Sequence, residues 1–173
     1  SLVQSLLGFL FRSKVGGIAN FKRAGSKVLI VSNHVSLLDG VLLAAFMPER
    51  ITFAINTGWT QKWFIPVIRL LVDFYPVDPA NPLSVRSLAE EIKKGRKVMI
   101  FPEGRVTTTG AMMKVYEGAG VIAAKAGAKI LPVRINGAQY SKFSYLKDKF
   151  PTRWFPKITL NILEPCRFPA VSA

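Results

Sequence analysis

His34 is the only histidine in this 173-residue chain and the residue best suited to acid–base chemistry at neutral pH. Asp39 follows it five residues later. A carboxylate at that distance can accept a hydrogen bond from the imidazole, fix its tautomer and stabilise the imidazolium that forms when the ring takes up a proton. We therefore predict that His34 is a general base and Asp39 its orienting partner, with the nucleophile supplied by the substrate.

The same spacing also has a structural interpretation. Ser36-Leu-Leu-Asp39 matches a capping box, in which Ser36 caps a helix and Asp39 satisfies backbone N–H groups at its start. On spacing alone, this interpretation is the better supported of the two. One carboxylate has few lone pairs to share, so we expect the two roles to coexist only in part.

A second polar segment, Phe-Pro-Glu-Gly-Arg at 101–105, has residues suited to binding a phosphate. Arg105 offers a planar fork of donors, and Gly104 allows the backbone to approach a ligand closely. A polar turn with a solvated arginine is the alternative. That alternative is weakened because the segment follows an apolar run, as His34 does.

The surrounding pattern predicts an α/β fold, with a mixed, largely parallel sheet flanked by helices. We expect strands or extended segments over 28–32, 51–55, 73–77, 97–101, 129–135 and 158–163, and helices over 40–47, 60–72, 82–94 and 115–126. Ligands gather at the carboxyl ends of strands in such sheets. Both polar segments follow a predicted strand, so we expect them to form one site.

Composition limits the class of protein. Hydrophobic residues make up 50% of the chain and the mean hydropathy is +0.28, which argues against disorder. The net charge of +14 favours an anionic partner, which can be nucleic acid, anionic lipid or an acidic protein. One cysteine rules out an intrachain disulfide, and one histidine with one cysteine argues against a zinc site. The apolar opening over 1–11 is too short to span a bilayer and suits either a core helix or an interfacial helix.

Taken together, Asn33-His34-x-Ser36-x-x-Asp39 and the pentapeptide at 101–105 resemble the two principal motifs of the glycerolipid (lysophospholipid) acyltransferase family. The strand 130–133, Ile-Leu-Pro-Val, resembles a late family motif. The resemblance covers nearly the whole chain. It is greatest to bifunctional bacterial inner-membrane enzymes that join a 2-acylglycerophosphoethanolamine acyltransferase domain to an adenylating acyl-carrier-protein synthetase.

This resemblance implies a glycerolipid acyltransferase-like fold over 1–173, as one domain excised from a longer membrane-associated protein with adenylating or transporter domains fused to it. It implies that His34 deprotonates a glycerol hydroxyl that attacks an acyl thioester, carried by acyl carrier protein or coenzyme A. No bound cofactor and no metal are implied, and the expected location is the cytoplasmic face of a bacterial inner membrane. The residues expected to bind the lysophospholipid acceptor are Asn33, Ser36, Glu103, Gly104 and Arg105.

One departure from the family pattern bears on the acceptor. Family members that act on lysophosphatidic acid usually carry an arginine in a stretch where this chain has Phe74. A phosphomonoester carries up to two negative charges and a phosphodiester only one. The loss of a cation therefore favours a diester headgroup such as that of 2-acylglycerophosphoethanolamine, with 1-acylglycerol 3-phosphate as the alternative acceptor.

Segment 142–157 interleaves cations with aromatic rings, a mixture suited to lipid headgroups, to single-stranded nucleic acid or to an ordinary solvated loop. A nucleic-acid-binding module would leave both motifs unexplained, so we expect an anionic membrane surface and no nucleic acid. The basic surface also suits acidic acyl carrier protein. The predicted membrane contacts are Trp59, Trp63, Lys147, Lys149, Arg153 and Trp154.

Overall fold

The computed structural model describes residues 2–59, 69, 72–78 and 81–167. Its helices are α1 (Leu2–Leu10), α2 (Ile18–Ala24), α3 (Asp39–Phe46), α5 (Pro82–Lys93) and α6 (Gly118–Ala126), with short 3-10 turns η1 (Thr57–Trp59) and η2 (Ala138–Tyr140). Its strands are β1 (Lys14–Gly16), β2 (Val28–Ser32), β3 (Thr52–Asn56), β4 (Asp73–Val77), β5 (Val98–Ile100), β6 (Lys129–Asn136) and β7 (Thr159–Ile162).

The seven strands form one sheet in the order β1-β7-β6-β2-β5-β3-β4. Strands β6, β2, β5, β3 and β4 are all parallel to one another, whereas β7 is antiparallel to β6 and β1 is parallel to β7. Apolar β-branched runs such as Val28–Val31 form the centre because both faces of a parallel sheet are covered. The predicted mixed, largely parallel sheet is confirmed.

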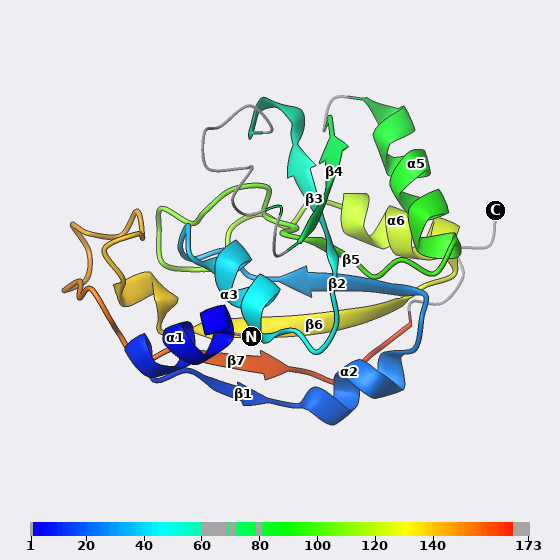
Figure 1. Ribbon diagram of the computed structural model, residues 1–173. Helices are drawn as coiled ribbons and strands as arrows, with labels where there is room; N and C mark the ends of the chain where they lie inside the picture. The colour runs from blue at the N-terminus through cyan, green and yellow to red at the C-terminus, as the bar shows by residue number, and fades with distance from the viewer. Residues whose placement is uncertain (1, 60–68, 70–71, 79–80, 168–173) are drawn as a thin grey trace.

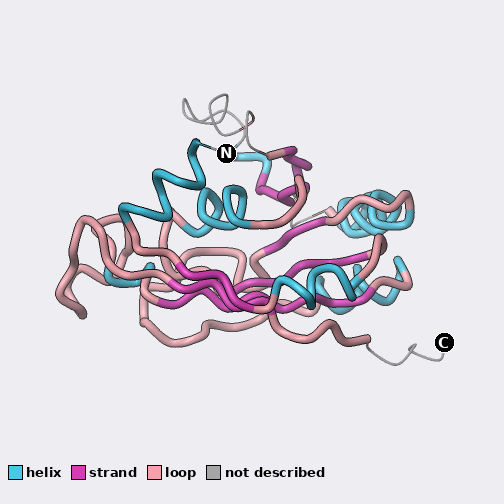
Figure 2. The backbone as a smooth tube through the Cα atoms, turned by 60° about the horizontal axis from the view of Figure 1, so that its bottom comes forward, coloured by secondary structure: helices cyan, strands magenta, loops and turns pink. Residues whose placement is uncertain are grey.

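Each face of the sheet has its own hydrophobic core. One core joins the sheet to α1, α2 and α3, and the other joins it to α5 and α6. Figure 1 shows α5 and α6 side by side, away from α1 and α3. Figure 2 shows helices on both sides of the strand layer. This layered arrangement leaves the carboxyl ends of β2 and β5 at one edge of the sheet.

The predicted strands are confirmed, with bounds that shift by at most one residue at either end. Helix α6 begins at Gly118 and not at 115, because Tyr116 donates its backbone N–H to Pro102 O (3.0 Å) and is held in the preceding loop. Strand β1 and helix α2 were not predicted, since neither three residues of strand nor one seven-residue helix makes a clear periodic pattern. The predicted helix 60–72 lies almost wholly outside the described residues.

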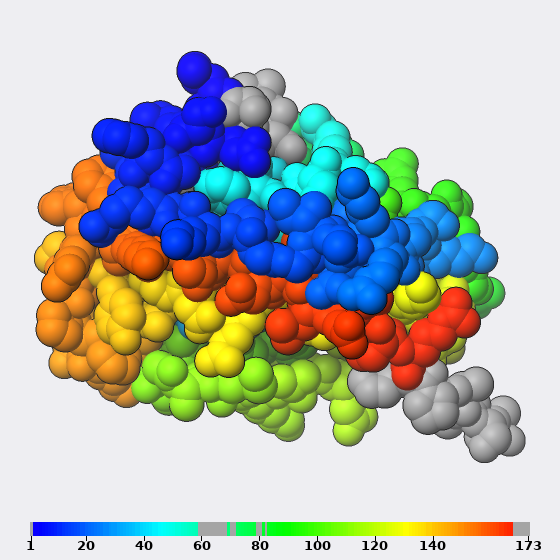
Figure 3. Space-filling view, turned by 90° about the horizontal axis from the view of Figure 1, so that it is seen from below, coloured from blue at the N-terminus to red at the C-terminus, as the bar shows by residue number. Residues whose placement is uncertain are grey.

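The N-terminal helix α1 serves partly as a core helix. Leu7 and Leu10 pack against the core, while Leu2 and Phe9 are 88% and 83% exposed. Beyond α1, the Phe11 ring meets Phe155 edge to face (5.6 Å), so the N-terminal segment lies beside segment 142–157 (Figure 3). Among the described residues, no helix combines the length and apolarity needed to cross a bilayer.

Candidate active site

Two loops that leave neighbouring parallel strands meet at the carboxyl edge of the sheet. The histidine loop, residues 33–39, follows β2, and the FPEGR loop, residues 101–107, follows β5. The backbone N–H of Thr107 donates to the carbonyl oxygen of His34 (2.8 Å). The structure therefore brings the two polar segments together, as their positions after strands predicted.

The predicted pairing of His34 with Asp39 is present in the structure. His34 Nδ1 lies 2.9 Å from Asp39 Oδ2. The imidazole is 17% exposed and the Asp39 side chain is completely buried. A buried carboxylate beside Nδ1 favours the tautomer with its proton on Nδ1, which leaves the Nε2 lone pair free to accept one.

Asp39 also accepts backbone N–H groups, as the structural interpretation expected, although these groups lie in the loop before α3. Its Oδ2 accepts the N–H groups of Val35 (2.6 Å) and Ser36 (2.9 Å) in addition to the imidazole. The arrangement is nevertheless no capping box, because α3 begins at Asp39 itself and the Ser36 hydroxyl accepts from the Leu38 N–H. Folding the loop back onto its own carboxylate is what places Asp39 against the ring.

Burial dominates the electrostatics of Asp39. Desolvation raises the pKa of its carboxyl above the usual 3.8, and the hydrogen bonds from His34, Ser36 and Val35 offset only part of that rise. Its second oxygen, Oδ1, is buried and has no hydrogen-bond partner among the described residues. The ionised form thus depends on the three donors that converge on Oδ2, one of which is the imidazole.

The FPEGR loop fixes the histidine from the other side. The Phe101 ring stacks on the imidazole at 3.8 Å with 12° between the planes, and Glu103 Oε1 accepts the backbone N–H of His34 (3.0 Å). No described residue bonds to His34 Nε2. A histidine held at its backbone, its ring face and its Nδ1, with Nε2 unoccupied, has the geometry of a general base.

Every backbone N–H from His34 to Leu38 already has an acceptor. Two of them donate to Asp39, one to Glu103, one to the Ser36 hydroxyl and one to the carbonyl of Phe143. Since these donors are occupied, this stretch cannot also stabilise an oxyanion on a reacting acyl group. That stabilisation must come from other residues.

Three residues predicted to bind substrate make hydrogen bonds that support the loops. The Asn33 amide bonds to both the N–H and the carbonyl of Ile135 (2.8 and 2.9 Å). Ser36 is fully buried and shares a 3.0 Å hydrogen bond with the Ser141 hydroxyl. Glu103 is 3% exposed, and its Oε2 accepts the Met113 N–H (2.9 Å). Their positions in the site are as expected, but their polar atoms are bonded to the protein.

Gly104 and Arg105, by contrast, face solvent. Gly104 has φ of +68°, a left-handed conformation that glycine adopts without strain, and it turns the chain out of β5. Arg105 is exposed, and its guanidinium has no hydrogen bond or ion pair with the described residues. It is therefore a free cation two residues from Thr107, which bonds to His34.

Sequence reasoning missed several residues of the site. Phe101 was assigned to its strand and to the motif at 101–105 but to no contact with His34, although an aromatic residue next to a polar turn is a weak sign of stacking. Ser141 and Ser144 lie more than a hundred residues from the histidine loop and contact it, as described below. No local signal in the sequence identifies such contacts.

The predicted membrane contacts are only partly described. Trp154 and Lys147 line an open groove of about 630 Å³ together with Leu37, Lys142, Phe143, Ser144 and Tyr145. Lys149 and Arg153 are exposed nearby in the sequence. Trp63 and the side chain of Trp59 lie outside the described part of the chain. The groove adjoins the site because Leu37 belongs to the histidine loop.

Known proteins support the family that the motifs indicate. The family model described as Acyltransferase matches residues 12–136, which include both loops and β6. The chain belongs to the acyltransferase family. Its fold is also found in the crystal structure of the 1-acyl-sn-glycerophosphate (LPA) acyltransferase PlsC from Thermotoga maritima. That match has a TM-score of 0.69 and 22% identity, and it covers 95% of this chain and 67% of the other.

Two relatives of this acyltransferase-family chain are named as acyltransferases that act on lipids. It is 30% identical over 134 residues to the chloroplastic 1-acyl-sn-glycerol-3-phosphate acyltransferase BAT2 of Brassica napus, covering 73% of this chain and 38% of BAT2. It is 32% identical over 143 residues to the lyso-ornithine lipid O-acyltransferase of Pseudomonas aeruginosa, covering 76% of this chain and 48% of that enzyme. The chain thus spans less than half of the length of these two relatives.

Proposed function

We propose that this chain transfers a fatty acyl group from an acyl thioester to the free glycerol hydroxyl of a lysophospholipid, in phospholipid remodelling. The observation that carries this proposal is the pairing of His34 with the buried Asp39, with Nε2 bonded to no described residue. Nε2 takes the hydroxyl proton as the hydroxyl oxygen bonds to the acyl carbon. The C–S bond then breaks, and the imidazolium returns the proton to the leaving thiolate. Proton transfer of this kind typically contributes ~10²–10⁴-fold.

The names of the relatives support this class of acceptor. They include acyltransferases for 1-acyl-sn-glycerol 3-phosphate, for lyso-ornithine lipid and for lysophospholipids. All of these names describe acyl transfer to a lipid that has a position free to accept an acyl group. The free Arg105 beside the histidine loop suits a phosphate-bearing acceptor.

Phe74 supports a phosphodiester headgroup, with 2-acylglycerophosphoethanolamine as the proposed acceptor. It packs against the core on the α3 side of the sheet, the side that also contains Phe101 and therefore the imidazole. A cation at position 74 would face the same side as the site, and this chain has none there. The second candidate, 1-acylglycerol 3-phosphate, is favoured by the names of several relatives.

An acyl-transfer assay read by mass spectrometry tests the proposal. We expect product with the wild-type chain and a loss of about 10²–10⁴-fold with His34→Ala. A matched control is Thr52→Val, which alters a buried residue on β3 outside both loops. Activity that survives in His34→Ala would contradict the mechanism. Faster acylation of 1-acylglycerol 3-phosphate than of 2-acylglycerophosphoethanolamine would contradict the headgroup assignment.

The donor and the site of action are part of the same proposal. The acyl group comes from acyl carrier protein or coenzyme A, and parallel assays with the two thioesters distinguish them. The chain acts at an anionic lipid surface of a bacterial inner membrane, on the cytoplasmic side. This is supported by the exposed cations and aromatic rings of segment 142–157, where each cation near anionic lipid adds ~1 kcal/mol.

Co-sedimentation with anionic liposomes at low salt tests this surface. Replacing Lys147, Lys149 and Arg153 together by alanine should weaken binding strongly, because three exposed cations of segment 142–157 are lost. Unchanged binding would contradict the role of this segment. A gel shift with single-stranded nucleic acid, if stronger than liposome binding, would instead favour the nucleic-acid class.

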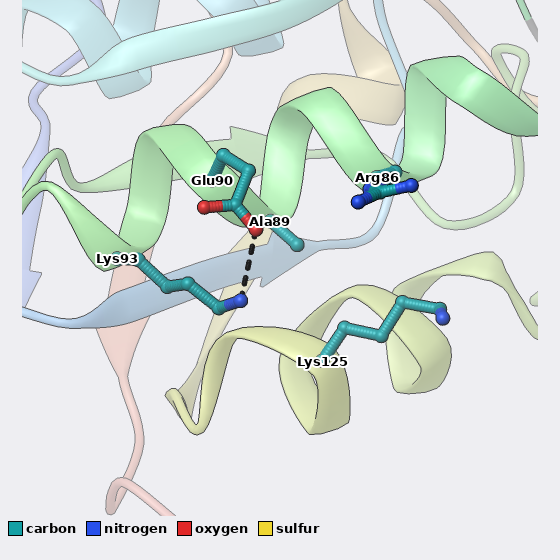
Figure 4. A pocket seen from close by; sticks show the side chains of 5 residues that line it. All are labelled: Arg86, Ala89, Glu90, Lys93 and Lys125. Atoms are coloured by element: carbon teal, nitrogen blue, oxygen red, sulfur yellow. Dashed lines mark hydrogen bonds and ion pairs between the residues drawn. The ribbon is translucent and has the colours of Figure 1, made fainter.

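A control variant with the same change in charge is available on the opposite face. A shallow hollow of about 310 Å³ between α5 and α6 is lined by Arg86, Ala89, Glu90, Lys93 and Lys125 (Figure 4). Replacing its three cations by alanine also removes three positive charges, but on the side of the sheet away from the histidine loop. Liposome binding should change less in this variant than in the first.

A further inference from the structure

The connection between β6 and β7 contacts the histidine loop directly. Ser144 Oγ donates to the carbonyl of Val35 (3.0 Å), and the carbonyl of Phe143 accepts the N–H of Leu37 (3.2 Å). Together with the bond between the Ser141 and Ser36 hydroxyls, these contacts join residues 141–144, here called the support segment, to three successive residues of the loop. Loop and segment are separated by more than a hundred residues in the sequence.

Two of these three contacts are made by buried hydroxyl groups. Ser36, Ser141 and Ser144 are all fully buried. A buried hydroxyl or carbonyl that loses its partner cannot be compensated by bulk water, so each bond strongly favours one loop conformation. Ser144 is itself constrained, because its hydroxyl oxygen accepts the N–H of Leu146 (3.2 Å).

Two segments hold the histidine loop, and each bonds to a different part of it. The FPEGR loop holds His34 itself, through its backbone N–H, its carbonyl and its ring. The support segment bonds to the next three residues, Val35, Ser36 and Leu37. The N–H groups of Val35 and Ser36 in turn donate to Asp39 Oδ2, which lies beside the imidazole. The Val35–Ser36 peptide group is held at both ends, since its carbonyl, that of Val35, accepts from Ser144 and its N–H, that of Ser36, donates to Asp39.

We propose that the support segment positions the His34–Asp39 pair for proton transfer, and that Ser144 is its principal positioning residue. Ser144 acts through the Val35 carbonyl and does not touch substrate. Loss of its hydroxyl frees the Val35–Ser36 peptide group to rotate. That rotation moves the Ser36 N–H away from Asp39 Oδ2 and displaces the carboxylate and the imidazole bonded to it. The proposal rests on the proposed acyl transfer only for its kinetic consequences.

The only histidine of the chain provides a test that does not depend on activity. The Nδ1–H of His34 should give one downfield proton resonance in the NMR spectrum of the wild-type chain, protected from exchange with water by Asp39. We expect this resonance to be broadened or lost in Ser144→Ala and retained in Ser144→Thr, which restores a hydroxyl. Thr52→Val, altered at a buried residue outside both loops, should leave the resonance unchanged.

In acyl-transfer assays we expect kcat to fall about tenfold to a hundredfold in Ser144→Ala, since small misplacements of reacting groups have effects of that size. The KM values for donor and acceptor should stay within about twofold, because a positioning residue does not contact either substrate. Ser144→Thr should recover most of kcat. Ser141→Ala should produce a smaller loss in the same direction and serves if Ser144→Ala does not fold.

Two results would overturn the proposal. One is a folded Ser144→Ala protein, or a folded Ser141→Ala protein in its place, with wild-type kcat and an unchanged Nδ1–H resonance. The other is a loss that appears in KM alone. If the wild-type chain acylates no lysophospholipid, the proposed function fails, and the NMR comparison still decides whether Ser144 holds the histidine in place.

Discussion

Asp39 and Glu103 are both buried carboxylates, one in each loop of the site, yet their surroundings differ. Glu103 divides its two oxygens between the backbone N–H groups of His34 and Met113, so each oxygen has one partner. Asp39 concentrates three donors on Oδ2 and leaves Oδ1 with none among the described residues. One carboxylate joins two loops, and the other is arranged around an imidazole.

This difference indicates a structural role for Glu103 and a chemical role for Asp39. Glu103 bonds only to backbone N–H groups, which do not titrate, and one of them belongs to the histidine loop. The pKa of Asp39 is raised by burial, and its ionised form is favoured most when the ring carries a proton. A carboxylate that is costly to bury and incompletely satisfied is typical of a functional site and not of a stabilising one.

The largest expected effect is that of Asp39→Asn on activity. We expect kcat to fall by about 10³–10⁴-fold, since an amide cannot provide the counter-charge of the imidazolium and can force the wrong tautomer. At neutral pH the free energy of unfolding should stay equal or rise, because a buried charge is removed. Activity assays and denaturant unfolding measure the two quantities. A large loss of stability with little loss of kcat would mean that Asp39, like Glu103, has a mainly structural role.

For Glu103→Gln we expect a larger effect on stability and a smaller effect on kcat than for Asp39→Asn. The amide NH₂ must then face one of two N–H donors, which should lower the free energy of unfolding by about 1–3 kcal/mol. Displacement of the loops should reduce kcat by about 10–100-fold. Chemical denaturation and steady-state kinetics test this. Intact stability together with a raised KM for the acceptor would show that Glu103 contacts substrate after all.

Arg105 lies two residues from Glu103 but, unlike Glu103, is exposed to solvent. We expect Arg105→Ala to raise the KM for the acceptor about tenfold, as loss of a charge-assisted phosphate contact implies. Its stability should stay within about 0.5 kcal/mol of wild type. Arg105→Lys should recover part of the affinity, since it keeps the charge but loses the planar fork. An unchanged KM in Arg105→Ala would mean that the phosphate binds elsewhere.

The smallest expected effect is a pH dependence of stability. A folded-state pKa above the unfolded value means that folding favours protonated Asp39. The contribution of Asp39 to stability is therefore fully present below pH 3.8 and is lost as the pH rises through the folded-state pKa. The stability of wild type relative to Asp39→Asn should decline across that range and then level off. Unfolding curves of both proteins at several pH values measure it, and a parallel pH dependence would contradict the sign.

The sequence by itself determined the type of fold and which two loops form the candidate site. Apolar runs at 28–32 and 97–101 identified β2 and β5, and polar residues directly after them identified the two loops. The parallel pairing of these strands then follows from the α/β pattern. Local periodicity and residue type are sufficient for such features, since they depend on few neighbours along the chain.

Only the tertiary structure decided what each site residue does. The spacing of Ser36 and Asp39 could not distinguish a capping box from a partner for the imidazole. In the folded loop Asp39 accepts from the imidazole and from the Ser36 N–H, without forming a capping box. Glu103 and Arg105 are two residues apart, yet one is buried between the loops and the other is free. The support from Ser144 crosses 109 positions of sequence, and only folding places it beside Val35. Roles of this kind depend on burial and on long-range partners, which a one-dimensional pattern does not contain.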